Sequence, residues 1–309
     1  MTRSTRGVLA YLALTFGLTW LPAWLLGSAW IGEGRPLVTR LLASSLFYAA
    51  CMGWQPFAVA SVVGRWVDPS GGRDRGLAPA RTRFIVLAAA APLVLAAAAV
   101  ALASLFGLIG APVPDSLHGH AEPELALAVP SAGKAFALTV AFLATGALIL
   151  AQSLGEEIGW RGYFMVHLMR RFGPWKGLFW HGLAWGLWYA PVFVIGREDV
   201  EGSTLRSAAF VLTCVLLGVL LGWLRLASRS IVPTTIANAV LTLTAGLPFL
   251  LQGVDVGLRG SAYGPPGWLP MAAAIAILAA GRWRATVAVP REGYGWIVYG
   301  QQPERRVLH

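Results

Sequence analysis

The chain has 309 residues, of which 57% are hydrophobic and only 12% are charged. A soluble globular domain carries about 25% charged residues, so this composition and the mean hydropathy of +0.64 exclude that class and indicate a polytopic membrane protein. The formal net charge of +10 does not indicate a nucleic-acid partner, because the basic residues are scattered over short loops. We therefore expect an all-α protein that contacts membrane lipid and binds no nucleic acid.

Eight apolar segments approach the ~20 residues that a helix needs to cross a bilayer. The sequence predicts transmembrane helices at 8–31, 41–64, 84–110, 135–158, 177–196, 207–225, 231–251 and 268–281. The first is interpreted as a membrane helix and not as a signal peptide, because its apolar stretch exceeds the usual length of about 7–15 residues and further spans follow. We expect one membrane domain over 1–309, with a polar cytoplasmic tail at 282–309.

The basic residues alternate from one connecting segment to the next. Eighteen of the 24 Lys and Arg residues precede the first span or follow the second, fourth, sixth and eighth spans, and the other loops hold six. Positively charged loops face the cytoplasm, so this pattern predicts that both termini are cytoplasmic. The expected location is the bacterial inner (plasma) membrane.

Two loops and two cysteines carry weaker signals. The 65–83 loop is basic and glycine-rich, and we expect it to lie against anionic lipid headgroups. The 111–134 loop contains a His-x-His pair, for which a solvated loop is favoured over a metal site. Cys51 and Cys214 fall inside predicted spans and are expected to be buried packing residues.

Two adjacent carboxylates, Glu156 and Glu157, stand at the end of the fourth apolar segment. Ionisable groups at membrane depth indicate a functional site. Glu157 and Arg161 lie four residues apart on one helix face, which predicts an ion pair. Glu156 points about 100° away and is predicted to be available for acid–base chemistry. A charged cap at the cytoplasmic interface is the alternative, and the spacing alone does not separate the two.

The fifth apolar segment carries a polar and aromatic stripe. His181, Trp185 and Tyr189 recur at every fourth residue, which places them on one side of a helix. The dense tryptophans also fit an interfacial belt, whereas a histidine within a span normally faces a partner or a cavity. Gly182 and Gly186 predict the close approach of a neighbouring helix.

The seventh apolar segment carries Asn238 and Thr242 four residues apart. Both side chains are polar, so we expect them to face protein and not lipid. Hydrogen bonding between helices is the simpler role for such a pair, and a place in a functional site is the alternative.

Together these segments resemble the CPBP family of intramembrane metalloproteases, which includes the CAAX prenyl proteases and the bacteriocin-processing (Abi) proteins. The family's first motif is Glu-Glu-x-x-x-Arg, and Glu156, Glu157 and Arg161 match it. Its second motif is an aromatic residue followed after three positions by His. Trp185 matches the aromatic residue, but Tyr189 stands at the His position.

The third motif of the family is His-x-x-x-Asn after a Ser-Leu-x-Pro-like opening. Residues 230–233 match the opening, while Asn238 stands at the His position and Thr242 at the Asn position. The resemblance covers 135–250 and implies a CPBP-like core made of the fourth to seventh helices.

The resemblance implies zinc, yet the replaced residues argue against an ordinary zinc site. A zinc ion that activates water needs neutral imidazoles, and a phenol and an amide are poor substitutes. Two other sites are conceivable. His181 could supply a relocated imidazole, although it lies ~12 Å along the helix from Tyr189. Glu156, Glu157 and Asn238 could instead form an oxygen-rich site for Mg²⁺ or Mn²⁺. The cofactor therefore stays open.

The resemblance implies an endopeptidase that cleaves a membrane-associated peptide or protein. In this interpretation Glu156 is the general base, Arg161 orients Glu157, and Tyr189 and Asn238 polarise the scissile carbonyl. The residues expected to contact substrate are Trp185, His181 and Thr242. The competing hypothesis is an inactive descendant that binds a peptide, lipid or partner protein. A small transporter is disfavoured, because the sequence lacks paired halves.

Overall fold

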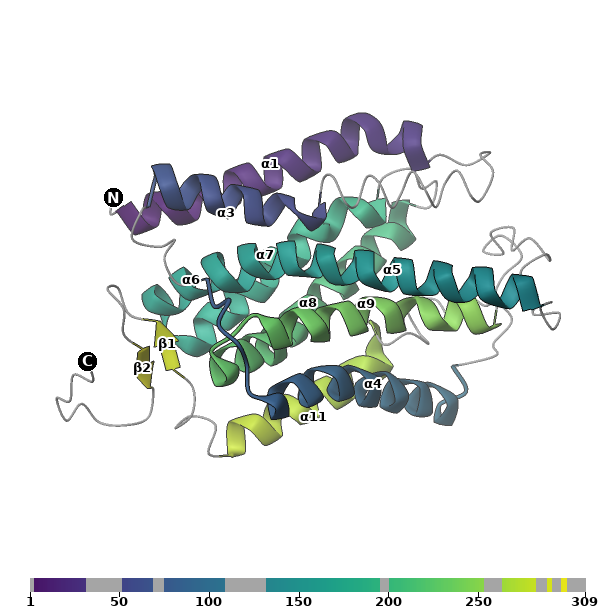
Figure 1. The fold of residues 1–309 in the computed structure, drawn as a ribbon. Coiled ribbons are helices and arrows are strands. Elements are labelled where there is room, and N and C mark those ends of the chain that lie inside the picture. The colour runs from purple at the N-terminus through teal and green to yellow at the C-terminus, as the bar shows by residue number, and fades with distance from the viewer. Residues whose placement is uncertain are drawn as a thin grey trace.

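A computed structural model describes residues 3–31, 52–68, 75–108, 132–194, 200–252, 263–281, 288–290 and 296–298. Almost all of them are helical (Figure 1). The helices are α1 (Arg3–Ile31), α3 (Gln55–Trp66), α4 (Thr82–Leu105), α5 (Ala132–Gly159), the π-helix η4 (Trp160–Phe164), α6 (Met165–Phe172), α7 (Pro174–Val194), α8 (Val200–Ser228), α9 (Val232–Gln252) and α11 (Pro265–Ala280).

The predicted helical class is confirmed, with one addition in the tail. Strand β1 (Ala288–Pro290) pairs antiparallel with β2 (Trp296–Val298). This small hairpin was not predicted from the sequence. It lies at the end of the helix bundle where α1 begins (Figure 1).

Each of the eight predicted apolar segments overlaps one of the described helices, although residues 41–51 of the second segment lie outside the described part. Among the described residues, three helices are long and apolar enough to cross a membrane: Arg3–Leu25, Thr82–Leu105 and Thr204–Ser228. The chain is therefore an integral membrane protein. The number of eight crossings and the cytoplasmic placement of the termini stay predictions.

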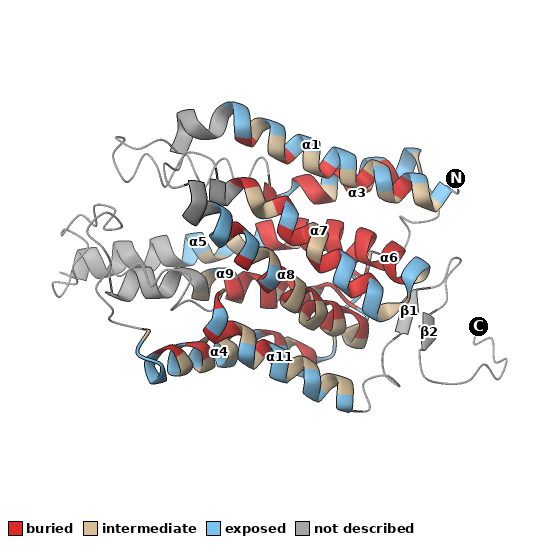
Figure 2. Ribbon diagram, turned by 180° about the vertical axis from the view of Figure 1, so that it is seen from behind, coloured by how far each residue is buried: buried red, intermediate tan, exposed pale blue. Residues whose placement is uncertain are grey.

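The motif-bearing helices occupy the middle of the bundle. Helices α1 and α3 lie along one side of it and α4 and α11 along the opposite side, with α5, α7, α8 and α9 between them (Figure 1). Buried residues concentrate in this middle layer, whereas the outer helices expose many large apolar side chains (Figure 2). This distribution suits a bundle whose outer surface faces lipid and whose polar groups lie inside.

Glycines bring α7 and α8 into close contact, as the sequence predicts. A Cβ atom at Gly182 would lie 2.7 Å from both the carbonyl oxygen of Cys214 and the Cα of Val215. A Cβ atom at Gly186 would lie 2.7 Å from the Cα of Val211. Backbone atoms cannot move away cheaply, so only glycine fits at both positions. Cys214 is buried at this contact as a free thiol, as expected, while Cys51 lies outside the described residues.

The described part of the basic loop packs on the protein, which the sequence did not predict. The N–H of Ile231 donates to the carbonyl of Gly76 (2.7 Å), and the hydroxyl of Ser230 donates to the carbonyl of Ala78 (2.5 Å). Gly76 has a φ of +72°, a conformation that favours glycine. The loop thereby anchors the start of α9, the helix that carries Asn238. The predicted headgroup contact of the loop stays a prediction.

The glycine contact between α7 and α8 makes a stability prediction. We expect Gly182→Ala to destabilise the protein by about 1–3 kcal/mol, because the new methyl group must displace backbone. The matched control is Gly146→Ala in α5, where a Cβ atom meets nothing within 4 Å. This control should be neutral or stabilising by up to ~1 kcal/mol through helix propensity. Thermal unfolding of the detergent-purified variants measures both, and equal midpoints would refute the packing argument.

Candidate functional site

The predicted ion pair between Glu157 and Arg161 is present at the end of α5. The Arg161 Nη1 atom donates to Oε1 of Glu157 at 2.7 Å, and both side chains are 0% exposed. The guanidinium carbon of Arg161 also lies 3.8 Å from the centre of the Trp185 ring on α7. The carboxylate and the indole face together hold this buried cation in one position.

Arg161 lies on η4, where the helix changes from α to π geometry. Short π segments are frequent at functional sites because they re-aim side chains without ending the helix. Gly162 on the same segment admits the backbone of the 75–81 loop, since a Cβ atom there would lie 2.9 Å from the Arg75 carbonyl oxygen. The first motif is therefore packed between α7 and this loop.

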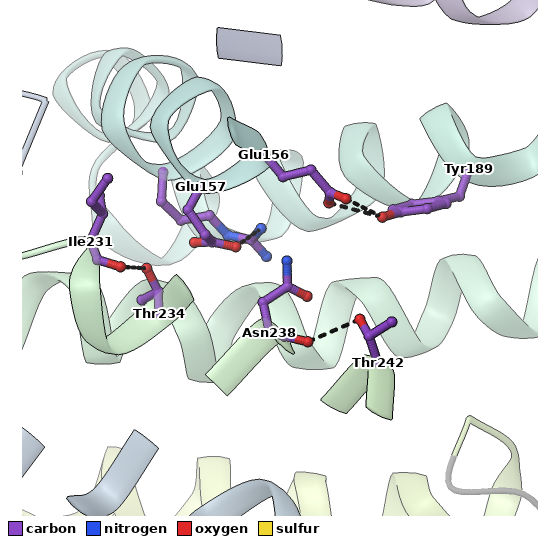
Figure 3. A network of polar contacts seen from close by, with 8 residues as sticks. Glu156, Glu157, Tyr189, Ile231, Thr234, Asn238 and Thr242 are labelled. Atoms are coloured by element: carbon purple, nitrogen blue, oxygen red, sulfur yellow. Dashed lines mark hydrogen bonds and ion pairs between the residues drawn. The ribbon is translucent and has the colours of Figure 1, made fainter. Parts of the chain in front are cut away.

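Glu156 contacts Tyr189, the residue at the His position of the second motif. The Tyr189 hydroxyl lies 2.9 Å from one carboxylate oxygen of Glu156 and 2.8 Å from the other, and it donates to them (Figure 3). Glu156 is 1% exposed, while Tyr189 is half-buried. The two neighbouring carboxylates thus have different partners, since a cation holds Glu157 and a neutral hydroxyl holds Glu156.

Asn238 lies on α9, across from the two glutamates. Its side chain is 6% exposed, and Figure 3 shows the amide pointing toward α5. Thr242 lies one turn further along and is exposed, and its predicted contact with substrate stays a prediction. Its hydroxyl donates to the Asn238 carbonyl at 3.0 Å, within α9. This bond to the preceding turn satisfies the hydroxyl without another helix.

His181 lies in an aromatic cluster two turns before Tyr189. It is 0% exposed, its ring centre lies 6.1 Å from Trp160 on η4, and it stacks on Trp185 at 6.5 Å. Trp185 in turn meets Tyr189 edge-on at 6.0 Å. The predicted stripe is therefore continuous from His181 to Tyr189, and it lines the side of α7 that faces η4.

The donor set does not fit zinc. Among the described residues, no three His, Cys, Asp or Glu side chains gather as a possible metal-ligand group. Glu157 is engaged by Arg161, and the Tyr189 hydroxyl acts as a hydrogen-bond donor to Glu156. Zinc prefers thiolate, imidazole or free carboxylate ligands, and these groups do not supply them. The reaction considered below therefore uses only side chains and water.

A second buried polar pair, which was not predicted from the sequence, joins α6 to the residue that follows α3. His167 places Nε2 3.1 Å from Oδ2 of Asp68 and Nδ1 2.7 Å from the carbonyl oxygen of Tyr163. A carbonyl oxygen only accepts, so Nδ1 is the donor in its contact with Tyr163. His167 and Asp68 are 99 positions apart, and no local pattern links them.

The part of the chain that resembles known proteins is the region that carries this site. Residues 137–244 match the family model of type II CAAX prenyl endopeptidase Rce1-like proteins. This segment includes the two glutamates, Arg161, the stripe on α7 and Asn238. Over this segment the chain is similar to the type II CAAX prenyl endopeptidases, which are the class of protein that the motif-bearing helices resemble.

A named relative agrees with this class. The chain is 26% identical over 126 residues to the CAAX prenyl protease 2 of Methanococcus maripaludis. The match covers 39% of this chain and 46% of that protein, so it spans less than half of the relative's length. The predicted resemblance to the CPBP family is confirmed for this region.

The buried ion pair makes a stability prediction. We expect Glu157→Gln to cost about 3–5 kcal/mol, because it leaves the Arg161 cation buried without a carboxylate. Arg81→Gln is the control, since Arg81 is exposed and its loss should change stability by less than about 0.5 kcal/mol. Thermal or denaturant unfolding in detergent compares the two variants. A Glu157→Gln protein as stable as wild type would mean that the pair does not support the fold.

The presence of Tyr189 and Asn238 at the family's histidine positions leads to a prediction about zinc binding. We expect the double variant Tyr189→His with Asn238→His to bind stoichiometric zinc, because it restores both imidazoles beside Glu156. The control pair Tyr189→Phe with Asn238→Leu changes the same positions without adding a ligand, and it should bind none. Elemental mass spectrometry of the purified proteins measures zinc per chain. A folded double-His variant without zinc would refute the alignment of these two positions with the family's histidines.

Proposed function

We propose that this protein is a CPBP-type endopeptidase that hydrolyses a membrane-associated peptide or protein with carboxylate and water chemistry. The observation that supports this proposal most is that two adjacent glutamates have chemically different partners. Arg161 holds Glu157 at 2.7 Å, whereas the hydroxyl of Tyr189 donates to Glu156 at 2.8 Å (Figure 3). Carboxylates whose environments differ in this way are suited to different roles in one site.

In the proposed reaction Glu156 is the general base. It removes a proton from a water molecule, whose oxygen bonds to the carbonyl carbon of the scissile peptide. Asn238 donates a hydrogen bond to the carbonyl oxygen as it gains negative charge. Once Glu156 has taken the proton from water, the Tyr189 hydroxyl turns from this carboxyl group and donates a second hydrogen bond to the same oxygen. When the C–N bond breaks, Glu156 returns the proton to the departing nitrogen, so the products are a carboxyl group and an amine.

The buried ion pair has a positioning role in this proposal. Glu157 and Arg161 are both 0% exposed, and Arg161 packs on Trp185 of the helix that carries Tyr189. The pair therefore links α5 to α7 next to Glu156. A base held within tenths of an ångström of its partners loses less entropy when it reacts.

A second function, binding without cleavage, has one specific observation in its favour. The Tyr189 hydroxyl contacts both carboxylate oxygens of Glu156, at 2.9 and 2.8 Å, and a water molecule must compete with it. In this case the bundle holds a peptide, a lipid or a partner protein. We propose the bacterial inner membrane as the location for either function, with both termini in the cytoplasm.

The experiment uses ¹⁸O-labelled water to detect hydrolysis directly. Wild-type protein in lipid nanodiscs is incubated in H₂¹⁸O with membranes from cells that lack it, and mass spectrometry searches for new C-termini that carry ¹⁸O. We expect such termini with wild type and a rate lower by about 10²–10⁴-fold with Glu156→Gln, because the general base is lost.

A tyrosine pair provides the matched control. Tyr189→Phe should lower the rate by about 10²–10³-fold through the lost oxyanion donor. Tyr263→Phe removes a hydroxyl that donates to the Leu241 carbonyl at 3.0 Å and not to a glutamate, and it should leave the rate unchanged. Labelled termini at equal rates in wild type and Glu156→Gln would rule out Glu156 as the base. No labelled termini, with peptides retained equally by both proteins, would favour binding alone.

A further inference from the structure

Several buried polar atoms around Arg161 have no hydrogen-bonding partner among the described residues. They are both ring nitrogens of His181, the indole nitrogen of Trp185, and Nε and Nη2 of Arg161. His181 and Arg161 are 0% exposed and Trp185 is 3% exposed. The role proposed for Arg161 uses only Nη1, which leaves the other atoms without a function.

These atoms belong to one cluster between η4 and α7. The guanidinium carbon of Arg161 lies 3.8 Å from the centre of the Trp185 ring, and the His181 ring stacks on Trp185 at 6.5 Å with an interplanar angle of 21°. Trp160 closes the cluster edge-on to His181 at 6.1 Å, and its indole nitrogen also lacks a partner. The unpartnered atoms therefore belong to side chains that contact one another through Trp185 in one buried cluster.

Leaving these groups without partners is expensive. Each buried donor or acceptor without a hydrogen bond costs about 1–3 kcal/mol. Native proteins avoid this cost with internal water molecules, each of which makes about three hydrogen bonds to such groups. A small polar ligand at this cluster would remove the cost.

The chemistry of the cluster selects water over an anion. The charge of Arg161 is already balanced by Glu157 at 2.7 Å, so a second anion is not required. A neutral imidazole has one nitrogen that donates and one that accepts, and water satisfies both kinds. An anion would serve the donors of Arg161 and Trp185 and leave the accepting nitrogen of His181 unsatisfied.

We infer that ordered water is bound between Arg161, His181 and Trp185, inside the helix bundle and beside Glu157. In the proposed function this water supplies the nucleophile for Glu156 in a layer where lipid excludes solvent, and that role rests on the proposed function. The hydration site itself does not. His181 is then a water-binding residue and not a relocated zinc ligand.

Radiolytic hydroxyl-radical footprinting tests the water directly. Radicals form from water, so buried side chains are oxidised when a water molecule lies next to them. We expect Trp185 in the full-length protein in nanodiscs to be oxidised several-fold faster than Trp188. Trp188 is the matched control, because it is 0% exposed and its indole N–H donates to the Thr19 hydroxyl at 2.7 Å.

The variant His181→Phe keeps the stacked ring and removes both nitrogens. We expect it to slow the oxidation of Trp185 toward the rate of Trp188. Should this variant fail to fold, the comparison of Trp185 with Trp188 in wild type remains decisive. Equal slow oxidation of the two tryptophans in wild type would overturn the inference.

Glu156→Gln separates this inference from the proposed function. It should abolish hydrolysis and leave the oxidation of Trp185 at the wild-type rate. Fast oxidation of Trp185 in a protein that cleaves nothing would support the water and refute the peptidase. Hydrolysis with a slowly oxidised Trp185 would support the peptidase and refute the water.

Discussion

The interior of this bundle depends on one buried ion pair. Glu157 and Arg161 are both fully buried, and their charges are tolerable there only because they neutralise each other at 2.7 Å. Trp185 adds the face of its ring to the guanidinium, which ties the end of α5 to α7. With Glu157 committed to Arg161, Glu156 is left to interact with other partners. The site therefore follows from the electrostatic cost of burying the first motif.

Tyr189 gives the site a character different from that of a metalloprotease. A histidine at this position would offer a lone pair to a metal, whereas the tyrosine hydroxyl donates a hydrogen bond to Glu156. The same helix position thus changes from an electron-pair donor to a proton donor. This change is compatible with a carboxylate mechanism or with a binding site, and it accounts for a CPBP-like region whose donors do not suit zinc.

The helix bundle has a polar interior and an apolar exterior, and different helices supply the two. Helices α5, α7 and α9 bring charged and hydrogen-bonding side chains together, while their neighbours present apolar surface outward (Figures 1 and 2). Glycines at the contact of α7 with α8 make the layer compact, and the aromatic stripe fills it. Bound water completes the hydrogen bonds that this dense packing leaves open.

The sequence by itself determined the membrane class, the helical segments, the Glu157–Arg161 pair and the stripe on α7. These are local properties, since hydropathy and a spacing of four residues act within one helix. Only the tertiary structure decided that Tyr189 bonds to Glu156, that Thr242 is exposed, and that His167 pairs with Asp68 across 99 positions. Such contacts depend on how helices pack and rotate against one another, and the spacing of residues along one chain segment carries no information about that.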